Sequence, residues 1–302
     1  MDVSPLTGCG SAARWPKPFW LAVGVIVLAF LWPLAVLARF AAGSDLYSYI
    51  LLVPVISVFL VWWQRTTLPS DTTPVRVWAA LPAALGLGFL ALAFTTQPSD
   101  ASPENRLALV ALAFVAFVAV ACLGFLGRRL VGALTFPIGF LIFLAPMPPS
   151  IVATVESFLQ HGSAAAALAM FSITGTPVFY HDLIFRLPGI NLRVAPECSG
   201  IHSSIVLFMV SLVAGYLFLR SPWRRTLLAI AMIPLALLRN GFRVFVIGEL
   251  CVHVSPDMID SYIHHHGGPI FFALSMVPFF ALLWWLVRSE RKPGPASAQP
   301  SS

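Results

Sequence analysis

Charged side chains are scarce in this chain of 302 residues. Lys, Arg, Asp and Glu together make up only 10% of the sequence, whereas hydrophobic residues make up 59% and the mean hydropathy is +0.88. About a quarter of the residues in a soluble globular domain are charged, so this composition excludes that class and predicts a multispanning membrane protein. The net charge of +6 does not indicate nucleic-acid binding, because the Lys and Arg residues stand in short groups between apolar runs. We expect the lipid bilayer as a partner and no nucleic acid.

Patterns that would hold a metal ion or a disulfide framework are also missing. The four cysteines, Cys9, Cys122, Cys198 and Cys251, show no Cys-x-x-Cys spacing, and the sequence has no His-Glu-x-x-His motif. We therefore expect no metal and no cofactor. Two alternatives stay open. One is a bridge between Cys198 and Cys251, and the other is a zinc peptidase whose histidines bind the metal together with His202 or Cys198, since imidazole and thiolate are favoured zinc ligands.

Long apolar runs are what the chain has in abundance. A run of about twenty residues, at 1.5 Å per helical residue, matches a hydrocarbon core about 30 Å thick. We predict about eight transmembrane helices, at 19–39, 47–63, 77–95, 107–126, 130–145, 200–219, 226–250 and 269–287. The fold class that follows is an all-α membrane protein.

Positive charge sets the orientation of these helices, because Lys and Arg in short loops favour the cytoplasmic side. With eight spans, most of the basic residues fall in inner loops, for example Arg128 with Arg129 and the group at 220–225. This topology predicts a cytoplasmic N-terminal segment at 1–18, a multispanning domain at 19–288 and a disordered cytoplasmic tail at 289–302.

A ninth apolar stretch, at 151–173, does not fit as a further span. It carries Glu156, Gln160 and His161, and a full crossing would either invert the first half of the chain or turn the basic group at 220–225 outward. We therefore predict an interfacial or re-entrant helix on the outer side.

Residues 178–194 alternate loosely between apolar and polar side chains around the turn at Pro188 and Gly189. This pattern predicts a short extracytoplasmic β-hairpin. Such a hairpin would deliver Cys198 to the membrane surface and would offer an extended peptide an edge with which to pair.

Cys198 begins the sixth span at its outer end in this topology. The positive end of a helix dipole and nearby cations stabilise a thiolate, which makes a cysteine nucleophilic near neutral pH. The neighbouring Glu197 opposes this effect, because a carboxylate disfavours the thiolate, so we assign it to orienting Arg243 or a substrate.

Two other polar groups reach the same depth from distant parts of the sequence. Arg243 lies eighteen residues beyond Arg225, about 27 Å at helical rise, and hence near the outer interface. His264 precedes the eighth span on that side. A guanidinium can stabilise the oxyanion of a tetrahedral intermediate, and an imidazole can act as the acid and base of acyl transfer. Cys198, Arg243 and His264 therefore indicate a membrane-embedded cysteine peptidase or transpeptidase.

Other polar residues near these three are supporting or alternative site residues. A residue four positions from another shares its helix face, which applies to Arg239 relative to Arg243 and makes His202 a rival base for Cys198. Four further candidates are close in sequence to Cys198, Arg243 or His264: Glu197, Asn240, His265 and His266. Asn240, three positions before Arg243, is placed to orient it.

Each of these residues also has a purely structural interpretation. A membrane-helix cysteine is usually a small apolar residue, an Arg near a span end often extends to the interface, and a solvated loop explains at least two of the three histidines. The main functional alternative is a polytopic transporter that uses the intramembrane Arg and His residues as a proton or anion path. Transporters usually show repeated halves, which this sequence lacks. A structural scaffold would leave the clustered outer-face residues unexplained.

Three motifs, in this order and spacing, resemble those of the exosortase and archaeosortase family. They are PECSGI at 196–201, RNGFR at 239–243, which contains an Asn-x-x-Arg pattern, and HHHGG at 264–268. YSY at 47–49, followed by LVP at 52–54, resembles an early signature of the same family. The resemblance makes residues 19–288 the catalytic domain, with Cys198 as nucleophile, Arg243 as the essential basic residue and His264 as the acid and base.

The resemblance also implies the substrate and the location of the enzyme. Members process exported proteins whose C-terminal sorting tail combines a short recognition motif, a hydrophobic helix and a basic cluster. The expected location is the bacterial or archaeal cytoplasmic membrane, with the active site on the extracytoplasmic side. The acyl acceptor implied is water or an amine of a lipid or surface molecule.

Overall fold

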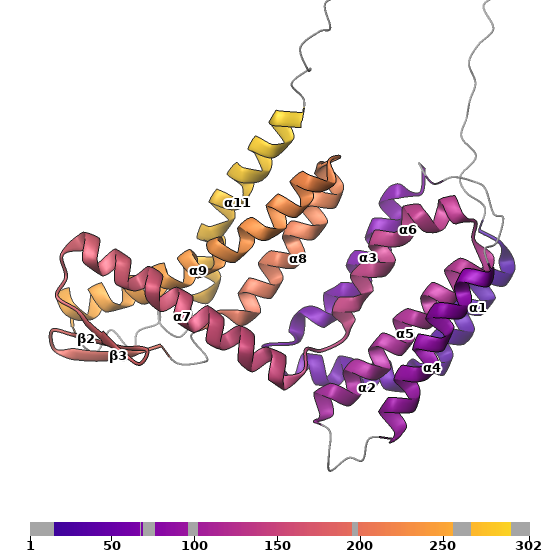
Figure 1. Cartoon of the computed structure of the whole chain (residues 1–302), viewed down its shortest axis with the longest axis horizontal. Coiled ribbons are helices and arrows are strands. Elements are labelled where there is room, and N and C mark those ends of the chain that lie inside the picture. The colour runs from indigo at the N-terminus through magenta and orange to yellow at the C-terminus, as the bar shows by residue number, and fades with distance from the viewer. Residues whose placement is uncertain are drawn as a thin grey trace, which may run out of the picture. The chain divides into compact units, whose positions relative to one another are not determined.

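A computed structural model describes residues 15–66, 68, 76–95, 102–194, 199–255 and 267–290. Figure 1 shows that they are mostly helical, with one small sheet. The chain packs as two compact units, Met1–Ile151 and Val152–Ser302. The assignment of residues 19–288 to a single catalytic domain stays a prediction.

The N-terminal unit contains all five apolar runs predicted in that half, and each of them is helical. Its longest helix, α5, lies alongside both α4 and α1. The elements are α1 (Lys17–Ala29), α2 (Leu31–Ala42), η1 (Ser48–Leu51), α3 (Leu52–Gln64), η2 (Arg76–Ala79), α4 (Ala80–Thr95), α5 (Pro103–Phe125), α6 (Arg128–Phe140) and η3 (Leu141–Leu144).

The first apolar run is not the single helix that we expected at 19–39. Helix α1 ends at Ala29 and α2 begins at Leu31, with a bend of 61° between them. Pro33 explains the break, because proline has no N–H and its ring collides with the carbonyl four residues earlier, here that of Ala29.

The YSY segment at 47–49 belongs to the core of the N-terminal unit. Tyr47 and Tyr49 are only 6% and 4% exposed. The Tyr47 hydroxyl donates to the main-chain oxygen of Met147 at 2.8 Å, which ties the start of η1 to the end of this unit. In this structure the early signature has a packing role.

The C-terminal unit contains the predicted site. Helices α8, α9 and α11 pack against one another, and α7 crosses the C-terminal half of α9 (Figure 1). The elements are α7 (Pro149–Thr174), β1 (Phe179–His181), β2 (Ile184–Leu187), β3 (Ile190–Arg193), α8 (Ile201–Phe218), α9 (Pro222–His253) and α11 (Gly268–Glu290).

The predicted hairpin at 178–194 is confirmed and gains a third strand, while its extracytoplasmic location stays a prediction. The sheet is antiparallel in the order β1-β2-β3. The turn between β1 and β2 consists of Asp182 and Leu183, whose φ angles are 49° and 62°. Two left-handed residues match the twist of a tight hairpin. Leucine rarely adopts that conformation, so this turn is hard to predict from the residues that form it. Leu183 adopts it while packing against the core under the sheet.

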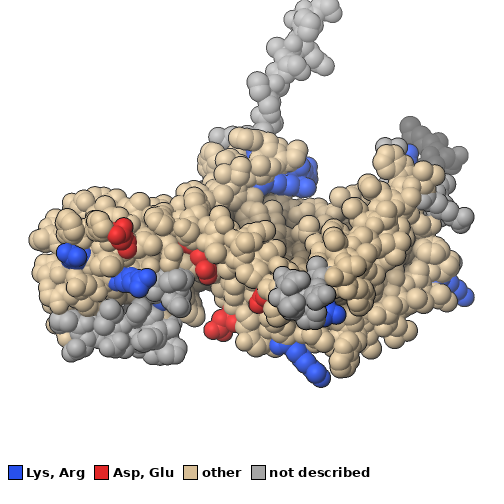
Figure 2. All heavy atoms as spheres, turned by 60° about the horizontal axis from the view of Figure 1, so that its bottom comes forward, with Lys and Arg blue, Asp and Glu red and all other residues tan. Residues whose placement is uncertain are grey.

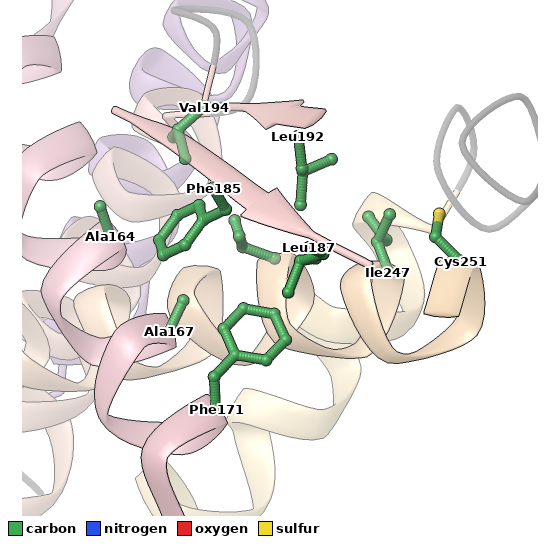
Figure 3. Packing of buried hydrophobic residues seen from close by; sticks show 10 residues of the cluster. Ala164, Ala167, Phe171, Phe185, Leu187, Leu192, Val194, Ile247 and Cys251 are labelled. Carbon is green, nitrogen blue, oxygen red and sulfur yellow. The ribbon is translucent and has the colours of Figure 1, made fainter. Parts of the chain in front are cut away.

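One face of the sheet packs onto α7 and α9. Figure 3 shows Phe185 and Leu187 of β2 and Leu192 of β3 facing Phe171 of α7 and Ile247 of α9. The two phenylalanines are fully buried, and burial of each such side chain stabilises the fold by about 2 kcal/mol. The sheet is therefore held on α7 and on α9, the helix that carries Arg239, Asn240 and Arg243.

Five helices of the described residues are long and apolar enough to cross a membrane: η2 with α4, α5, α8, α9 and α11. Two broken pairs, α1 with α2 and α6 with α7, raise the number to seven at most. The chain is thus a multi-pass membrane protein. Figure 2 agrees, since charged side chains are few and scattered on the face shown. The count of eight spans and the interfacial or re-entrant placement of α7 stay predictions.

Gly248 provides a test of the packing between the sheet and the helices. A Cβ atom at this position would lie 2.5 Å from Phe171 Cζ and 3.0 Å from Leu187 Cδ1. We expect Gly248→Ala to destabilise the protein by about 1 to 3 kcal/mol, because an overfilled core must shift. Thermal unfolding of the purified protein in detergent measures the loss. Gly132→Ala, at an exposed helical glycine with nothing within 4 Å of the added Cβ, is the matched control and should unfold at or above the wild-type temperature.

Candidate functional site

Five of the predicted site residues lie outside the described residues. They are Cys198, Glu197, His264, His265 and His266. Their roles stay predictions, and so does the bridge between Cys198 and Cys251. The structure does describe both flanks of the segment that carries Cys198, together with Arg239, Asn240, Arg243 and His202.

Gly200, two residues after Cys198, is the N-cap of α8 and has a φ angle of +68°. Only glycine enters this left-handed region without steric cost. Next to it, Ser199 is 1% exposed, and its Oγ accepts a hydrogen bond from the N–H of Ile201 at 3.4 Å. The sequence Ser-Gly-Ile therefore forms a buried, tightly turned entry into α8.

Arg239 of α9 holds this turn from the side. Its Nη2 donates to the carbonyl oxygen of Gly200 and to Ser204 Oγ, both at 3.3 Å. The Arg239 side chain is 8% exposed, and no carboxylate of the described residues forms an ion pair with it. A buried cation without a counter-ion is costly, so these two bonds are a main compensation. They join the RNGFR and PECSGI segments, which are far apart in the sequence.

Asn240 also packs against this turn. Its Oδ1 lies 3.0 Å from the position that a Cβ atom on Gly200 would occupy, as does Arg239 Nη2. Its Nδ2 donates to Ser163 Oγ of α7 at 3.1 Å. Asn240 therefore links α7 to the start of α8 through a side chain that is only 3% exposed. Its role in orienting Arg243 stays a prediction.

Gly241 permits this arrangement because it brings α9 very close to α7. A Cβ at Gly241 would lie 2.6 Å from Ala166 Cβ and 2.8 Å from the main-chain oxygen of Ser163. Small residues at helix crossings let membrane helices approach each other closely. The glycine within RNGFR thus has a packing role, which allows Asn240 to reach Ser163.

The other flank of the Cys198 segment is held by α7. Gln160 is 8% exposed, and its Nε2 donates to the main-chain oxygen of Val194 at 3.4 Å. The N–H of Val194 donates to Leu183 at 2.9 Å, so the end of the sheet is fixed as well. Residues 195–198 therefore run between two anchored ends, one at Val194 and the other at Gly200.

Arg243 adds a second guanidinium one turn along α9. It is half-buried, and its Nε is shielded from solvent. Positions four apart lie on one helix face, about 6 Å apart along the axis. Arg243 therefore adds positive charge on the helix face from which Arg239 contacts the entry to α8. Positive charge there favours anionic groups and negative charge that develops in a reaction.

The observed bounds of α9 also bear on the predicted depth of Arg243. The helix begins at Pro222, so Arg243 lies 21 residues further on, a rise of about 32 Å. This length is close to the hydrocarbon thickness of a bilayer. A helix that starts at the inner interface would bring Arg243 to the outer one.

The remaining candidates are less tightly placed. His202 is half-buried in the first turn of α8, and its role as a rival base stays a prediction. Cys251 is buried in the core under the sheet. Among the residues that the structure describes, no three His, Cys, Asp or Glu side chains are grouped to hold a metal ion.

The sequence pattern missed two polar residues of this network. Gln160 stands in the predicted interfacial stretch at 151–173 without a role in the predicted site, and the same pattern assigns no role to Ser163. A signal was present, because both stand within a mostly apolar helix, where a buried polar side chain requires a hydrogen-bond partner. Their partners are Val194, the residue after β3, and Asn240 of α9. Local periodicity carries no information about such long-range contacts.

Comparison with known families gives one match. The model of the family described as Transmembrane exosortase matches residues 39–281. This range covers well over half of the chain and includes all three motifs. It confirms the family that the motifs resemble. No curated protein and no solved structure was found to match the chain.

Gly200 and Gly189 form a matched pair that tests the site geometry. Both have positive φ angles, but a Cβ at Gly189 has nothing within 4 Å, whereas one at Gly200 meets Arg239 and Asn240. We expect Gly189→Ala to lower stability by about 1 to 2 kcal/mol from backbone strain alone. Gly200→Ala should cost about 1 to 3 kcal/mol more, because Arg239 and Asn240 must move. Thermal unfolding in detergent compares the two variants, and equal losses would contradict the described contacts.

Proposed function

Because the chain belongs to the transmembrane exosortase family, we propose that it is a membrane cysteine peptidase or transpeptidase that cleaves C-terminal sorting signals of exported proteins. Family membership supports a sorting-related membrane protein that processes exported proteins. The specific reaction, its residues and its side of the membrane are the proposal.

The observation that carries the proposal is the hydrogen bond between Arg239 and Gly200. It attaches the segment that follows Cys198 to the helix that carries Arg243. A nucleophile and the group that stabilises its oxyanion must be held in one geometry to be effective. A rigid contact between their two segments is what such a site requires.

In the first step, the Cys198 thiolate attacks the carbonyl carbon of the scissile peptide bond. The carbonyl oxygen becomes an oxyanion, and Arg243 stabilises it with its guanidinium. The oxyanion then collapses, the C–N bond breaks, and His264 gives a proton to the leaving amine of the C-terminal tail. The N-terminal part of the substrate remains attached to Cys198 as a thioester.

In the second step, a new nucleophile attacks the thioester carbonyl. An amine of a lipid or surface molecule yields a relocated protein, and water yields a released protein with a free carboxylate. His264 takes the proton of the incoming nucleophile, and the thiolate of Cys198 is regenerated. His202, His265 and His266 are the alternatives to His264 for these proton transfers.

The sorting tail fits a membrane-embedded site. Its hydrophobic helix would lie beside the spans, since a helix satisfies its own backbone hydrogen bonds within lipid. Its basic cluster would stay on the cytoplasmic side. The recognition motif would then meet Cys198 at the extracytoplasmic surface of the cytoplasmic membrane.

The proposal is tested with an exported reporter protein that ends in a short motif, one apolar helix and a terminal Arg cluster, taken from the same cell. We expect Cys198→Ala to lower processing of this reporter at least about a thousandfold, because the nucleophile is lost. Mass spectrometry of the wild-type protein should find the N-terminal part of the reporter on Cys198, in a hydroxylamine-sensitive bond.

Cys122→Ala is the matched control, since Cys122 is buried in a core cluster of the N-terminal unit that contains none of the described residues flanking Cys198. It should process the reporter as the wild type does. Wild-type processing by Cys198→Ala would overturn the proposed chemistry and would favour the transporter interpretation.

A further inference from the structure

Strand β3 is an outer strand of the sheet and leads directly into the Cys198 segment. In the part of the chain that the structure describes, the order β1-β2-β3 leaves one side of β3 without a neighbouring strand. Cys198 follows Val194, the residue after the strand, by only four positions. Four residues reach at most about 14 Å, so a peptide held along β3 would end close to the proposed nucleophile.

The backbone of β3 presents two residues to its open side. The N–H of Val194 donates to Leu183 in the direction of β2. Bonded positions alternate along an antiparallel ladder, so the N–H and C=O groups of Leu192 and Val194 point toward β2. Those of Asn191 and Arg193 point away from it. Within the described part of the chain, neither of these two N–H groups donates to another backbone oxygen.

Strand β3 is held in place by its side chains that point into the core. Leu192 and Val194 are 6% and 2% exposed and point into the core over α7 and α9, as Figure 3 shows. Asn191 and Arg193 are exposed. A strand that is fixed before binding loses little conformational entropy when a peptide adds to it, which favours strand addition.

The other outer strand offers much less. The register of β1 with β2 pairs His181 with Ile184 across the two-residue turn, so by the same alternation only Tyr180 turns its backbone outward. Strand β3 is also the outer strand that continues toward Cys198.

The direction of a paired substrate follows from its own structure. The part of the sorting tail beyond the scissile bond is a helix in lipid, whose backbone groups are already bonded to one another. Only the segment before the scissile bond is free to pair. That segment runs toward the cleavage point as β3 runs toward Cys198, so the two would be parallel.

We infer that β3 is a docking strand, and that the extended polypeptide segment just before the scissile bond of the substrate adds to its open edge through Asn191 and Arg193. This inference rests on the proposed function and names how the same site holds its substrate. Main-chain pairing would provide affinity without demanding one sequence, while the side chains around Cys198 would select the motif.

The first test compares two substitutions at one position in the full-length protein, with the exported reporter described above. Arg193→Pro removes the outward N–H, which the ladder does not use, and Arg193→Ala removes only the side chain. We expect the proline variant to process the reporter about fivefold more slowly than the alanine variant, the effect of one lost hydrogen bond. Equal rates in two variants with equal thermal stability would overturn the inference.

The second test does not depend on turnover. Full-length protein with Cys198→Ala and Asn191→Cys is combined with reporters that carry one cysteine at successive positions before the tail. Strand addition predicts disulfide cross-links that peak at every second position, because side chains alternate along a strand. Uniform cross-linking, or none, would contradict the docking of the substrate on β3. This test decides between the two outcomes even if Arg193→Pro fails to fold.

The two proposals fail in different ways. Wild-type processing by Cys198→Ala would reject the cysteine chemistry whatever the cross-links show. The docking strand alone would be rejected by a different set of results. In that case Cys198→Ala is inactive, the cross-links lack the period of two, and Arg193→Pro and Arg193→Ala process the reporter at equal rates.

Discussion

The hydrogen bond from Arg239 to the carbonyl of Gly200 is the interaction on which the described site depends. It places a guanidinium inside an apolar helical unit, where an isolated charge is strongly disfavoured. The guanidinium is stabilised there because the Gly200 carbonyl and Ser204 Oγ accept hydrogen bonds from its Nη2. The same bond fixes the left-handed turn at Gly200, and so the position at which the chain leaves the Cys198 segment and enters α8. A feature that is costly by itself thereby fixes the described end of the segment that carries Cys198.

Close packing between α7 and α9 supports that interaction. Gly241 brings the two helices into contact, so that Asn240 reaches both Ser163 and the turn at Gly200. One turn before Ser163 along α7, Gln160 bonds to Val194 at the end of the sheet. The Cys198 segment is thus held at both ends by two helices that are themselves packed through small residues. This arrangement suits acyl transfer, in which small displacements of the nucleophile lower the rate considerably.

Much of this could be predicted from the sequence, because hydropathy and charge act locally. The apolar runs became helices, and the pattern around Pro188 and Gly189 became a hairpin. The third strand was missed because its turn uses Leu183 in a conformation that leucine rarely adopts. The contacts of Gln160, Ser163 and Arg239 depend on which helices meet, and local patterns do not encode that. The number of spans stays undecided by sequence, since short and broken helices such as α1 with α2 meet the length criterion only in pairs.

The central claim is that Arg239 positions Cys198 for attack by holding Gly200. The most direct test measures how fast the reporter forms a hydroxylamine-sensitive bond to Cys198 in the purified full-length protein, reconstituted in lipid nanodiscs. Arg239→Met keeps most of the side-chain volume but removes every donor, and Arg224→Met is the control at the far end of the same helix, where Arg224 pairs with Glu290. The account predicts that Arg239→Met slows acylation at least about tenfold, which corresponds to about 1.4 kcal/mol in the activation barrier. Arg224→Met should be acylated as fast as the wild type. The thermal stability of both variants is measured alongside. Equal acylation by folded Arg239→Met and wild-type protein would contradict the account.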